Sequence, residues 1–265
     1  MRVSHAVITA AGPDQRHLPL QTLVDRDGET RSLLGITVGA ALTGGVEEVG
    51  VVVCPGDEAA YAAVLGPLMN RVTFLEQPEP RGYGDAVLQA RDFVGDEPFL
   101  HLIGDHVFVS TTDRSCVQQL VAAAVANDCS ISAVVATRET LLPYFGAVGG
   151  RRVTGSDDLF VVERVMEKPT PTEAEQELVV PGLRAGHYLC FSGLHVLTPT
   201  IMDLLSADAI DLQPGAKLEL SPALNELAQK EKYLAMDVKG LRYAADARYG
   251  LLTAQLALAL SGPDR

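Results

Sequence analysis

Short apolar runs alternate with longer amphipathic stretches along the first half of the chain. The short, β-branched runs predict strands, and the longer periodic stretches predict helices. The predicted strands are Ala6–Thr9, Val49–Cys54, Val72–Leu75, Phe99–Ile103 and Ile131–Ala136. The helices predicted between them are Leu33–Leu42, Asp57–Leu65, Ala86–Phe93 and Cys116–Ala126. This alternation indicates an α/β fold with a mostly parallel, mixed sheet flanked by helices.

The second half of the chain alternates less regularly. Its predicted strands are Leu159–Met166, Tyr188–Leu197 and Tyr233–Val238. Its predicted helices are Pro199–Leu205, Pro222–Lys230 and Tyr249–Leu260. Because no low-complexity linker or internal repeat separates the halves, we expect one domain over residues 1–265, with halves 1–140 and 141–265.

Composition narrows the classes of ligand and location. The net charge of −13, from 21 basic and 34 acidic residues, repels nucleic-acid backbones and anionic membranes, so neither is an expected partner. A phosphate-bearing ligand then needs a local cluster of positive groups, with a metal ion as helper. No apolar run approaches the roughly 20 residues of a membrane span, and the first residues lack a signal-peptide pattern, so we expect a cytoplasmic protein. The four cysteines lie far apart in apolar surroundings and predict buried, reduced thiols.

Candidate chemistry lies at the ends of predicted strands, where ligands of parallel α/β sheets gather. The loop Ala10-Ala11-Gly12 follows the first strand and is itself followed by Arg16. Small residues let the backbone approach a base or phosphate closely, and a guanidinium can hold phosphate oxygens. An ordinary turn with a surface arginine fits the same residues.

Two further strand ends carry charged residues. Asp105 ends a buried strand, as a Mg²⁺ ligand often does in phosphoryl chemistry, although a plain turn also suits it. Glu167 and Lys168 end another strand, where they can meet sugar hydroxyls and a sugar phosphate; a structural ion pair is the alternative.

His101 lies inside an apolar strand and is expected to be a core residue. His106 is a candidate contact to phosphate or sugar, with a structural role as its alternative.

The order of these motifs resembles that of the bacterial UTP–glucose-1-phosphate uridylyltransferases, within the wider sugar-1-phosphate nucleotidyltransferase family. The resemblance covers nearly the whole chain, and a shared order of several motifs is hard to obtain by chance. The matching segments are residues 7–12 with Arg16 and Leu18-Pro19, Gln77–Val87, Gly104-Asp105, Tyr144–Gly146, Glu167–Pro169, Ser192–Leu194, and Gly240–Tyr243 with Gly250.

This resemblance implies a nucleotide-diphospho-sugar transferase (Rossmann-like) fold, with a nucleotide-binding first half and a sugar-binding second half. It implies a nucleoside triphosphate and a sugar 1-phosphate as ligands and Mg²⁺ as cofactor. By position, the implied roles are nucleotide binding for Ala10, Ala11, Gly12, Gln77 and Gly82, sugar binding for Gly146, Glu167 and Gly193, catalysis for Arg16, Asp105 and Lys168, and metal binding for Asp105 with Asp246.

The phosphate loop departs from the family pattern. Where the family has Gly-x-Gly-Thr-Arg, this chain has Gly12-Pro13-Asp14-Gln15-Arg16, so Pro13 removes an N–H donor and Asp14 adds a negative charge. The lysine that follows Leu-Pro in the family is missing, and Arg26 and Arg31 do not fall at its position. An Asp-Gly turn signal in the inserted residues 25–31 predicts a short hairpin.

The second metal position departs as well. Ala244 stands where relatives carry a second metal-binding aspartate. Asp246 is the candidate substitute, because residues i and i+2 share a face of an extended chain.

Two functions therefore compete. The first is an enzyme that makes a UDP-sugar, most simply UDP-glucose, and pyrophosphate from UTP and a sugar 1-phosphate. The second, motivated by the altered loop, is a homologue with weak or no catalysis that binds nucleotide or nucleotide sugar as a sensor or partner subunit. A dinucleotide-binding oxidoreductase is disfavoured, because no G-x-G-x-x-G follows the first strand. Base, sugar and a possible homo-oligomer stay open.

Overall fold

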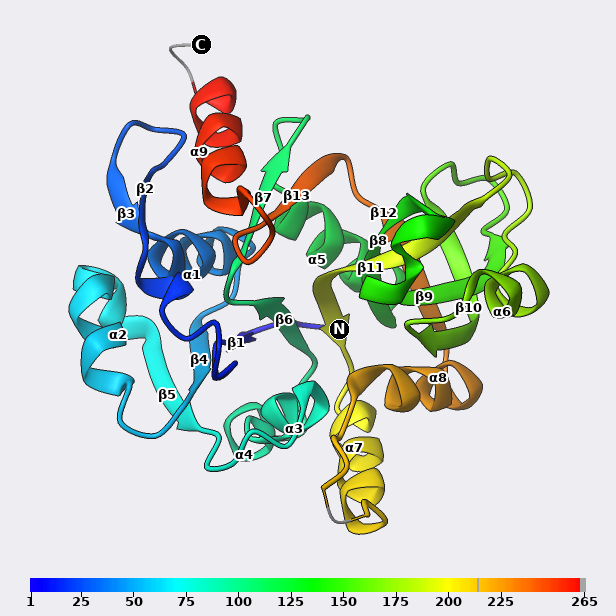
Figure 1. Cartoon of the computed structure of the whole chain (residues 1–265), viewed down its shortest axis with the longest axis horizontal. Coiled ribbons are helices and arrows are strands. Elements are labelled where there is room, and N and C mark those ends of the chain that lie inside the picture. Colours follow the sequence, from blue (N-terminus) through cyan, green and yellow to red (C-terminus); the bar gives the residue numbers. More distant parts are fainter. Residues whose placement is uncertain (214, 263–265) are drawn as a thin grey trace.

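Strands from both halves of the chain form one nine-stranded sheet in the computed structural model, which describes residues 1–213 and 215–262. In spatial order the strands are β5 (Val72–Glu76), β4 (Glu48–Val53), β1 (His5–Thr9), β6 (Phe99–Ile103), β11 (His187–Leu197), β8 (Ser130–Arg138), β12 (Tyr233–Asp237), β10 (Leu159–Glu167) and β9 (Gly146–Arg152). The halves meet where β6 pairs with β11 (Figure 1).

Parallel pairing is concentrated in the first half. β5, β4, β1 and β6 are parallel neighbours, and β12 is parallel to β8. In contrast, β11 is antiparallel to β6 and β8, and β9 is antiparallel to β10. The expected α/β fold with a mixed sheet is confirmed. The second half is less parallel than expected because a short loop, residues 153–158, joins β9 directly to β10, and short loops connect antiparallel strands.

Helices cover both faces of this sheet (Figure 1). They are α1 (Leu33–Thr43), α2 (Glu58–Leu65), α3 (Tyr83–Leu88), α4 (Arg91–Val94), α5 (Cys116–Asn127), α6 (Pro171–Glu177), α7 (Thr200–Ile210), α8 (Leu220–Lys230) and α9 (Gly250–Ser261). Alternate residues of β1 show the two layers: Ala6 and Ile8 belong to the core with α1, α2 and α5, whereas Val7 belongs to the core with α3, α7 and α8.

One predicted helix is wrong. Ala86–Phe93 is not continuous, because α3 ends at Leu88 and α4 begins at Arg91. Ala90 between them has left the helical region, with φ −88° and ψ 5°. Arg91 then donates from Nη1 to the Met202 carbonyl oxygen of α7 at 2.9 Å. A tertiary contact thus holds α4 in its own direction.

Two small antiparallel ribbons stand outside the main sheet. The predicted hairpin is confirmed as β2 (Thr22–Val24) and β3 (Thr30–Ser32), with Gly28 in its turn at φ 83°. The second ribbon was not predicted and pairs β7 (His106–Ser110) with β13 (Gly240–Ala244). It joins the segment after β6 to the segment before α9, which lie far apart in the sequence.

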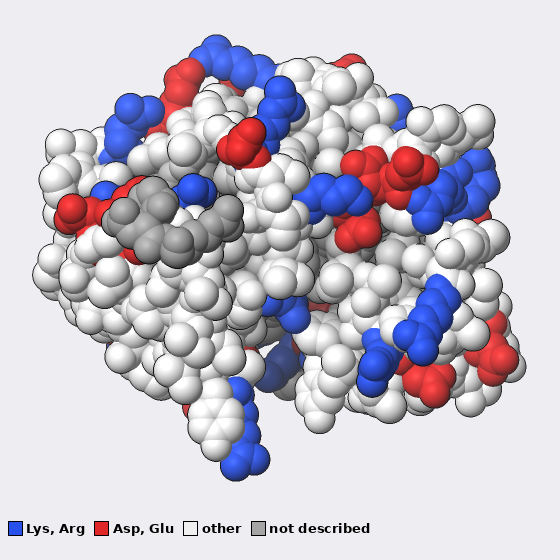
Figure 2. Space-filling view, turned by 90° about the horizontal axis from the view of Figure 1, so that it is seen from above, with Lys and Arg blue, Asp and Glu red and all other residues white. Residues whose placement is uncertain are grey.

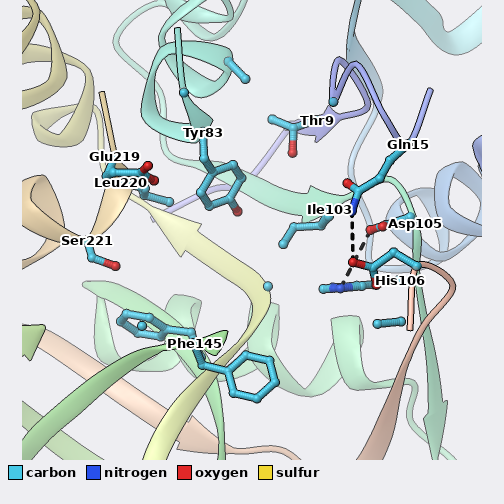
Figure 3. A pocket seen from close by; sticks show the side chains of 18 of the residues that line it. Thr9, Gln15, Tyr83, Ile103, Asp105, His106, Phe145, Glu219, Leu220 and Ser221 are labelled. Carbon is cyan, nitrogen blue, oxygen red and sulfur yellow. Dashed lines mark hydrogen bonds and ion pairs between the residues drawn. The ribbon is translucent and has the colours of Figure 1, made fainter. Parts of the chain in front are cut away.

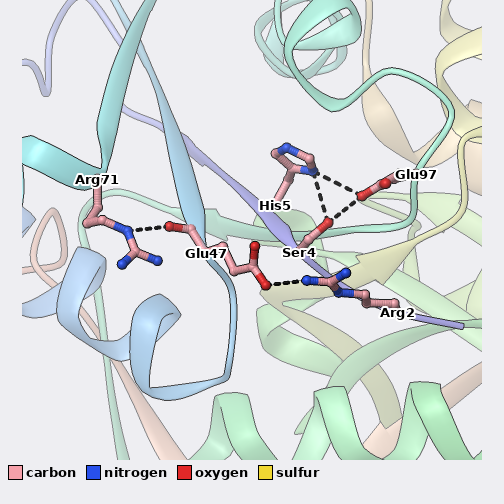
Figure 4. A network of polar contacts seen from close by, with 6 residues as sticks. All are labelled: Arg2, Ser4, His5, Glu47, Arg71 and Glu97. Carbon is pink, nitrogen blue, oxygen red and sulfur yellow. Dashed lines mark hydrogen bonds and ion pairs between the residues drawn. The ribbon is translucent and has the colours of Figure 1, made fainter.

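A polar network surrounds the amino-terminal end of β1 (Figure 4). Arg2 pairs with Glu47, and Ser4 donates to Glu97. Arg71 Nε donates to the Glu47 carbonyl oxygen at 2.6 Å. These contacts fix loops at the base of the sheet, although exposed pairs of this kind add little stability.

Basic and acidic side chains are interspersed over the face seen in Figure 2 and do not merge there into one broad basic patch. No helix in the described parts of the chain combines the length and apolar character needed to cross a membrane.

Candidate active site

A cavity of about 1010 Å³ opens at the carboxyl ends of β1 and β6, where Thr9 and Ile103 line it. Its remaining walls come from both halves of the chain, as expected for a ligand site in an α/β sheet. Figure 3 shows Gln15, Asp105 and His106 gathered on one side, facing Glu219 and Ser221 across the opening. The charged lining residues in the described chain are Asp14, Asp105, Glu167, Glu219, Asp246, Lys168, Lys217 and Arg242.

The loop after β1 reaches the cavity only in part. Ala11 and Gly12 line it, whereas Ala10 does not. Tyr61 of α2 holds the loop from below, because its hydroxyl donates to the Ala10 oxygen at 3.2 Å and to the Arg16 oxygen at 2.8 Å. The backbone path of the loop is thus fixed by the core.

Arg16 lies outside the cavity lining. Its guanidinium forms an ion pair with Asp57, at the start of α2. The catalytic role implied for Arg16 therefore has no support in this arrangement. Arg26 and Arg31 are also turned elsewhere, with Arg31 Nε 2.7 Å from an oxygen of Asp25 and Arg26 Nε 3.9 Å from Asp27.

Asp105 and Asp246 come together through the β7–β13 ribbon. The ribbon places Ala244 opposite His106, and the Ala245 N–H donates to the Asp105 carbonyl oxygen at 2.9 Å. Asp105 is buried, and its Oδ1 has no hydrogen-bond partner in the described chain. Burial, and then the charge of Asp246, raises the pKa of Asp105 to about 6. Gln15 Nε2 donates to Asp246 Oδ2 at 2.9 Å.

His106 lines the cavity beside this pair, with Nε2 3.7 Å from Asp105 Oδ1. Burial, followed by the nearby charge of Arg242, lowers the pKa of His106 to about 3. The imidazole is therefore neutral near pH 7, so His106 can meet a ligand as a hydrogen-bonding group and not as a cation.

Another part of the cavity wall is built around Gln77, which follows β5 and is buried. Its Nε2 donates to Asp85 Oδ2 at 2.8 Å and to the Gly82 carbonyl oxygen at 3.1 Å. Gly82 has φ 117°, and a Cβ there would overlap the backbone of Leu218. The Leu218 N–H donates to the Arg81 oxygen at 2.7 Å, which closes the segment before α8 onto this loop.

Glu167 and Lys168 end β10 on the sugar side of the expected site. Glu167 Oε1 lies 3.3 Å from Lys168 Nζ, and Oε2 accepts from Ser221 Oγ at 2.6 Å. A Cβ at Gly146 would lie 2.7 Å from Ser221 Oγ and 3.1 Å from Glu167 Oε2. Lys168 has φ 47°, a conformation that is uncommon for a long side chain and that clusters at functional sites.

Gly193 lines the cavity at an irregularity of β11, where the pairing with β8 shifts. Its φ is 76°, and a Cβ would lie 2.6 Å from Ile103 Cδ1 and 2.8 Å from His106 Nδ1. A larger residue at Gly193 would therefore displace the segment that carries Asp105.

His101 is a core residue, as its sequence position indicated. Its Nδ1 bonds to the Val7 carbonyl oxygen at 3.0 Å, which makes Nδ1 the donor and leaves Nε2 to accept from Tyr83 Oη at 2.6 Å. Burial lowers the pKa of His101 to about 4, so the ring is neutral. This contact orients Tyr83, which lines the cavity.

Some lining residues carry no strong signal in the sequence. The segment before α8 supplies Lys217 and Glu219, the first turn of α8 supplies Ser221, and the β7–β13 ribbon supplies Arg242. Polar residues just before and at the start of an amphipathic helix were the available signal for the first three. Arg242 sits in the closing family motif, but no role was predicted for it.

The whole chain is similar to known proteins of one kind. The model of the family described as nucleotidyl transferase matches residues 16–242. A UTP–glucose-1-phosphate uridylyltransferase from Streptococcus pneumoniae is 32% identical over 197 residues, which are 73% of this chain but only 60% of that relative. Another from Streptococcus pyogenes is 28% identical over 293 residues, covering 99% of this chain and 90% of the relative.

The fold has a matching likeness among solved structures. A UDP-glucose pyrophosphorylase in complex with UDP-glucose superposes with a TM-score of 0.78 at 20% identity, covering 97% of this chain and 98% of that one. The expected nucleotide-diphospho-sugar transferase fold is thereby confirmed. Because the family model spans most of the chain, from the loop after β1 to the β7–β13 ribbon, this protein belongs to the nucleotidyl transferase family of enzymes.

Proposed function

We propose that this enzyme transfers a uridylyl group from UTP to a sugar 1-phosphate, glucose 1-phosphate first of all, and releases pyrophosphate. The observation that carries the proposal is that three groups line one cavity. They are a polar wall at Gln77, the carboxylates of Asp105 and Asp246, and the acceptor–cation pair of Glu167 and Lys168. The two relatives named above are UTP–glucose-1-phosphate uridylyltransferases, which supports this proposal.

Gln77 supports a uracil-type base. Asp85 and the Gly82 carbonyl can only accept hydrogen bonds, so both hold the amide NH₂ of Gln77 and fix its orientation. The Oε1 atom is then the group left to meet a ligand, and it accepts a hydrogen bond. Uracil presents its N3–H as a donor on this edge, whereas cytosine presents an acceptor at N3.

Glu167 supports a sugar in another part of the cavity. A carboxylate has more acceptor positions than its contacts with Ser221 and Lys168 use, so it can also accept from sugar hydroxyls. Gly146 leaves room beside it, because any Cβ there would press on Ser221 and Glu167. Lys168 Nζ can then approach the phosphate attached to the sugar.

A divalent cation fits the residues at Asp105 and Asp246. The unpartnered buried Oδ1 of Asp105 beside a second carboxylate is the donor set of an oxygen-ligated ion. No group of three or more metal-ligating side chains occurs within the described residues, so phosphate oxygens and water would complete the shell of a Mg²⁺ ion. When bound, Mg²⁺ supplies charge neutralisation for the phosphates.

The reaction needs little covalent chemistry from the protein. An oxygen of the sugar phosphate forms a bond to the α-phosphorus, the bond from that phosphorus to the bridging oxygen of the β-phosphate breaks, and the electron pair leaves with pyrophosphate. Gln77 and Glu167 orient the two substrates, and Lys168 offsets the charge of the incoming phosphate. Positioning and charge stabilisation of this kind account for most catalysis of phosphoryl-type transfer.

A nucleotide-sugar binder without turnover is the second candidate. Arg16 pairs with Asp57 outside the cavity, and Asp14 adds negative charge to the lining. Both features weaken binding of a triphosphate. They leave the walls around Gln77 and Glu167 intact, as a binder requires.

Pyrophosphate release separates the two candidates. The assay supplies Mg²⁺, each nucleoside triphosphate in turn and a panel of sugar 1-phosphates. We expect the highest kcat/KM with UTP and glucose 1-phosphate. If no pair turns over while UDP-glucose binds by calorimetry, the enzyme proposal is overturned and the binder stands.

A further inference from the structure

Arg242 is a cation in the cavity wall whose guanidinium forms no ion pair with any carboxylate of the described residues. It lies in β13, paired in register with Phe108 of β7, and it lines the cavity. Within the described residues, its guanidinium makes no ion pair within 4.0 Å and donates no hydrogen bond to a protein group. A guanidinium held this way lacks the partner that a largely buried charge normally requires.

Phe145 holds this guanidinium in place. The Arg242 Cζ lies 4.7 Å from the centroid of the Phe145 ring, so the side chain is supported on one side by an aromatic face. Phe145 belongs to the turn before Gly146, and its carbonyl oxygen accepts from the Lys168 N–H at 3.1 Å. Arg242 and Lys168 therefore flank the same turn.

The negative charges nearest in effect to Arg242 belong to the carboxylates of Asp246 and Asp105. Burial lowers the pKa of Arg242, and the negative charges of Asp246 and Asp105 act in the opposite direction. The guanidinium thus lies within electrostatic reach of both carboxylates, and it packs on Phe145, in the turn that also contacts the Lys168 backbone. A phosphate group bridging these two regions would lie beside the guanidinium.

We propose that Arg242 binds the diphosphate of the nucleotide sugar and takes over charge stabilisation that the altered loop after β1 has lost. This inference rests on the proposed function. Its planar fork can donate two parallel hydrogen bonds to phosphate oxygens, which a lysine cannot reproduce. The cavity lining has five carboxylates and three cations in the described chain, so each cation that meets phosphate matters.

The test compares Arg242→Gln with a matched control. Arg152 also stacks on a phenylalanine, with Cζ 4.8 Å from the Phe160 centroid, and it lies outside the cavity. Calorimetry in Mg²⁺ buffer measures binding of uridine, UDP-glucose and inorganic pyrophosphate to wild type, Arg242→Gln, Arg242→Lys and Arg152→Gln.

We expect Arg242→Gln to bind UDP-glucose and pyrophosphate about 10- to 100-fold more weakly, as the loss of a charge-assisted hydrogen-bond pair implies. Uridine binding stays unchanged, Arg242→Lys is intermediate, and Arg152→Gln matches wild type. Unchanged affinity for both phosphates, or an equal loss for uridine, overturns the role of Arg242. If wild type binds pyrophosphate but not UDP-glucose, the proposed function fails. The pyrophosphate affinities of wild type and Arg242→Gln then still test whether Arg242 binds phosphate. Wild type that binds neither contradicts both.

Discussion

At the scale of the residue, Asp105 is the buried carboxylate of the proposed metal site, and its burial opposes its ionisation. Its carboxylate is buried near Asp246, and Oδ1 has no partner in the described chain. Such a site is unfavourable in the metal-free protein and favourable once a cation shares it. The arrangement indicates that this part of the chain is built for a ligand.

Asp105→Asn tests that conflict. The folded-state pKa of Asp105 is about 6 against a reference value of 3.8, so ionisation opposes folding. At about 1.4 kcal/mol per pKa unit, this penalty is absent below pH 4, grows between pH 4 and 6, and reaches about 3 kcal/mol above pH 6.

We therefore expect Asp105→Asn to abolish turnover and yet to raise the free energy of unfolding of the metal-free protein at pH 8, with the gain vanishing toward pH 4. Urea denaturation at both pH values measures it. The exposed change Asp92→Asn serves as the control. A variant that is less stable than wild type at pH 8 would refute the electrostatic account.

Asp85 accepts a hydrogen bond from the Gln77 amide, and we predict that this contact controls the choice of base. In Asp85→Asn the new side chain can donate as well as accept, so the Gln77 amide is free to turn its NH₂ toward the cavity. We expect the ratio of kcat/KM for UTP over CTP to fall about tenfold, the effect of one misplaced hydrogen bond, mainly through KM. Steady-state kinetics measure it, with Glu79→Gln, an exposed carboxylate-to-amide change nearby, as the control. An unaltered ratio would mean that Asp85 is only structural.

At the scale of the element, local patterns predicted most strands and helices of the first half. The Asp-Gly turn predicted the hairpin at residues 25–31, and the apolar strand around His101 predicted that this histidine lies in the core. The break between α3 and α4 and the β7–β13 ribbon did not follow, because contacts between distant segments create both. Arg242 was not predicted to line the cavity for the same reason, because the β7–β13 pairing brings it there. Glu167 and Lys168, in contrast, belong to a recognisable local motif.

The junction between the loop of Gly82 and the segment before α8 is an element-scale feature that can be tested. Gly82→Ala places a Cβ against the Leu218 backbone and also strains the backbone at φ 117°. Gly45→Ala is a matched control, because Gly45 has φ 100° and nothing within 4 Å of a Cβ.

Backbone strain of this type costs about 1–3 kcal/mol, so both variants should lose stability in urea denaturation. Only Gly82→Ala should lose more than that and raise the KM for UTP, since the junction positions Gln77. Equal losses in both variants, with an unchanged KM, would show that the junction does not shape the base site.

At the scale of the whole molecule, the cavity exists because β6 and β11 join the two halves in one sheet. The sequence motifs predicted that Gln77, Asp105 and Lys168 would meet, and all three line the cavity. The sequence could not place Arg16, because its ion pair with Asp57 depends on how α2 packs beneath the loop.

The reverse reaction tests the central claim most directly, because it needs one nucleotide sugar and one anion. Phosphorus NMR follows UDP-glucose with pyrophosphate, Mg²⁺ and the wild-type enzyme. We predict loss of the diphosphate resonances of UDP-glucose together with the growth of those of UTP and glucose 1-phosphate. An unchanged spectrum from protein that demonstrably binds UDP-glucose would contradict the assignment of this chain as a UDP-sugar-forming nucleotidyltransferase.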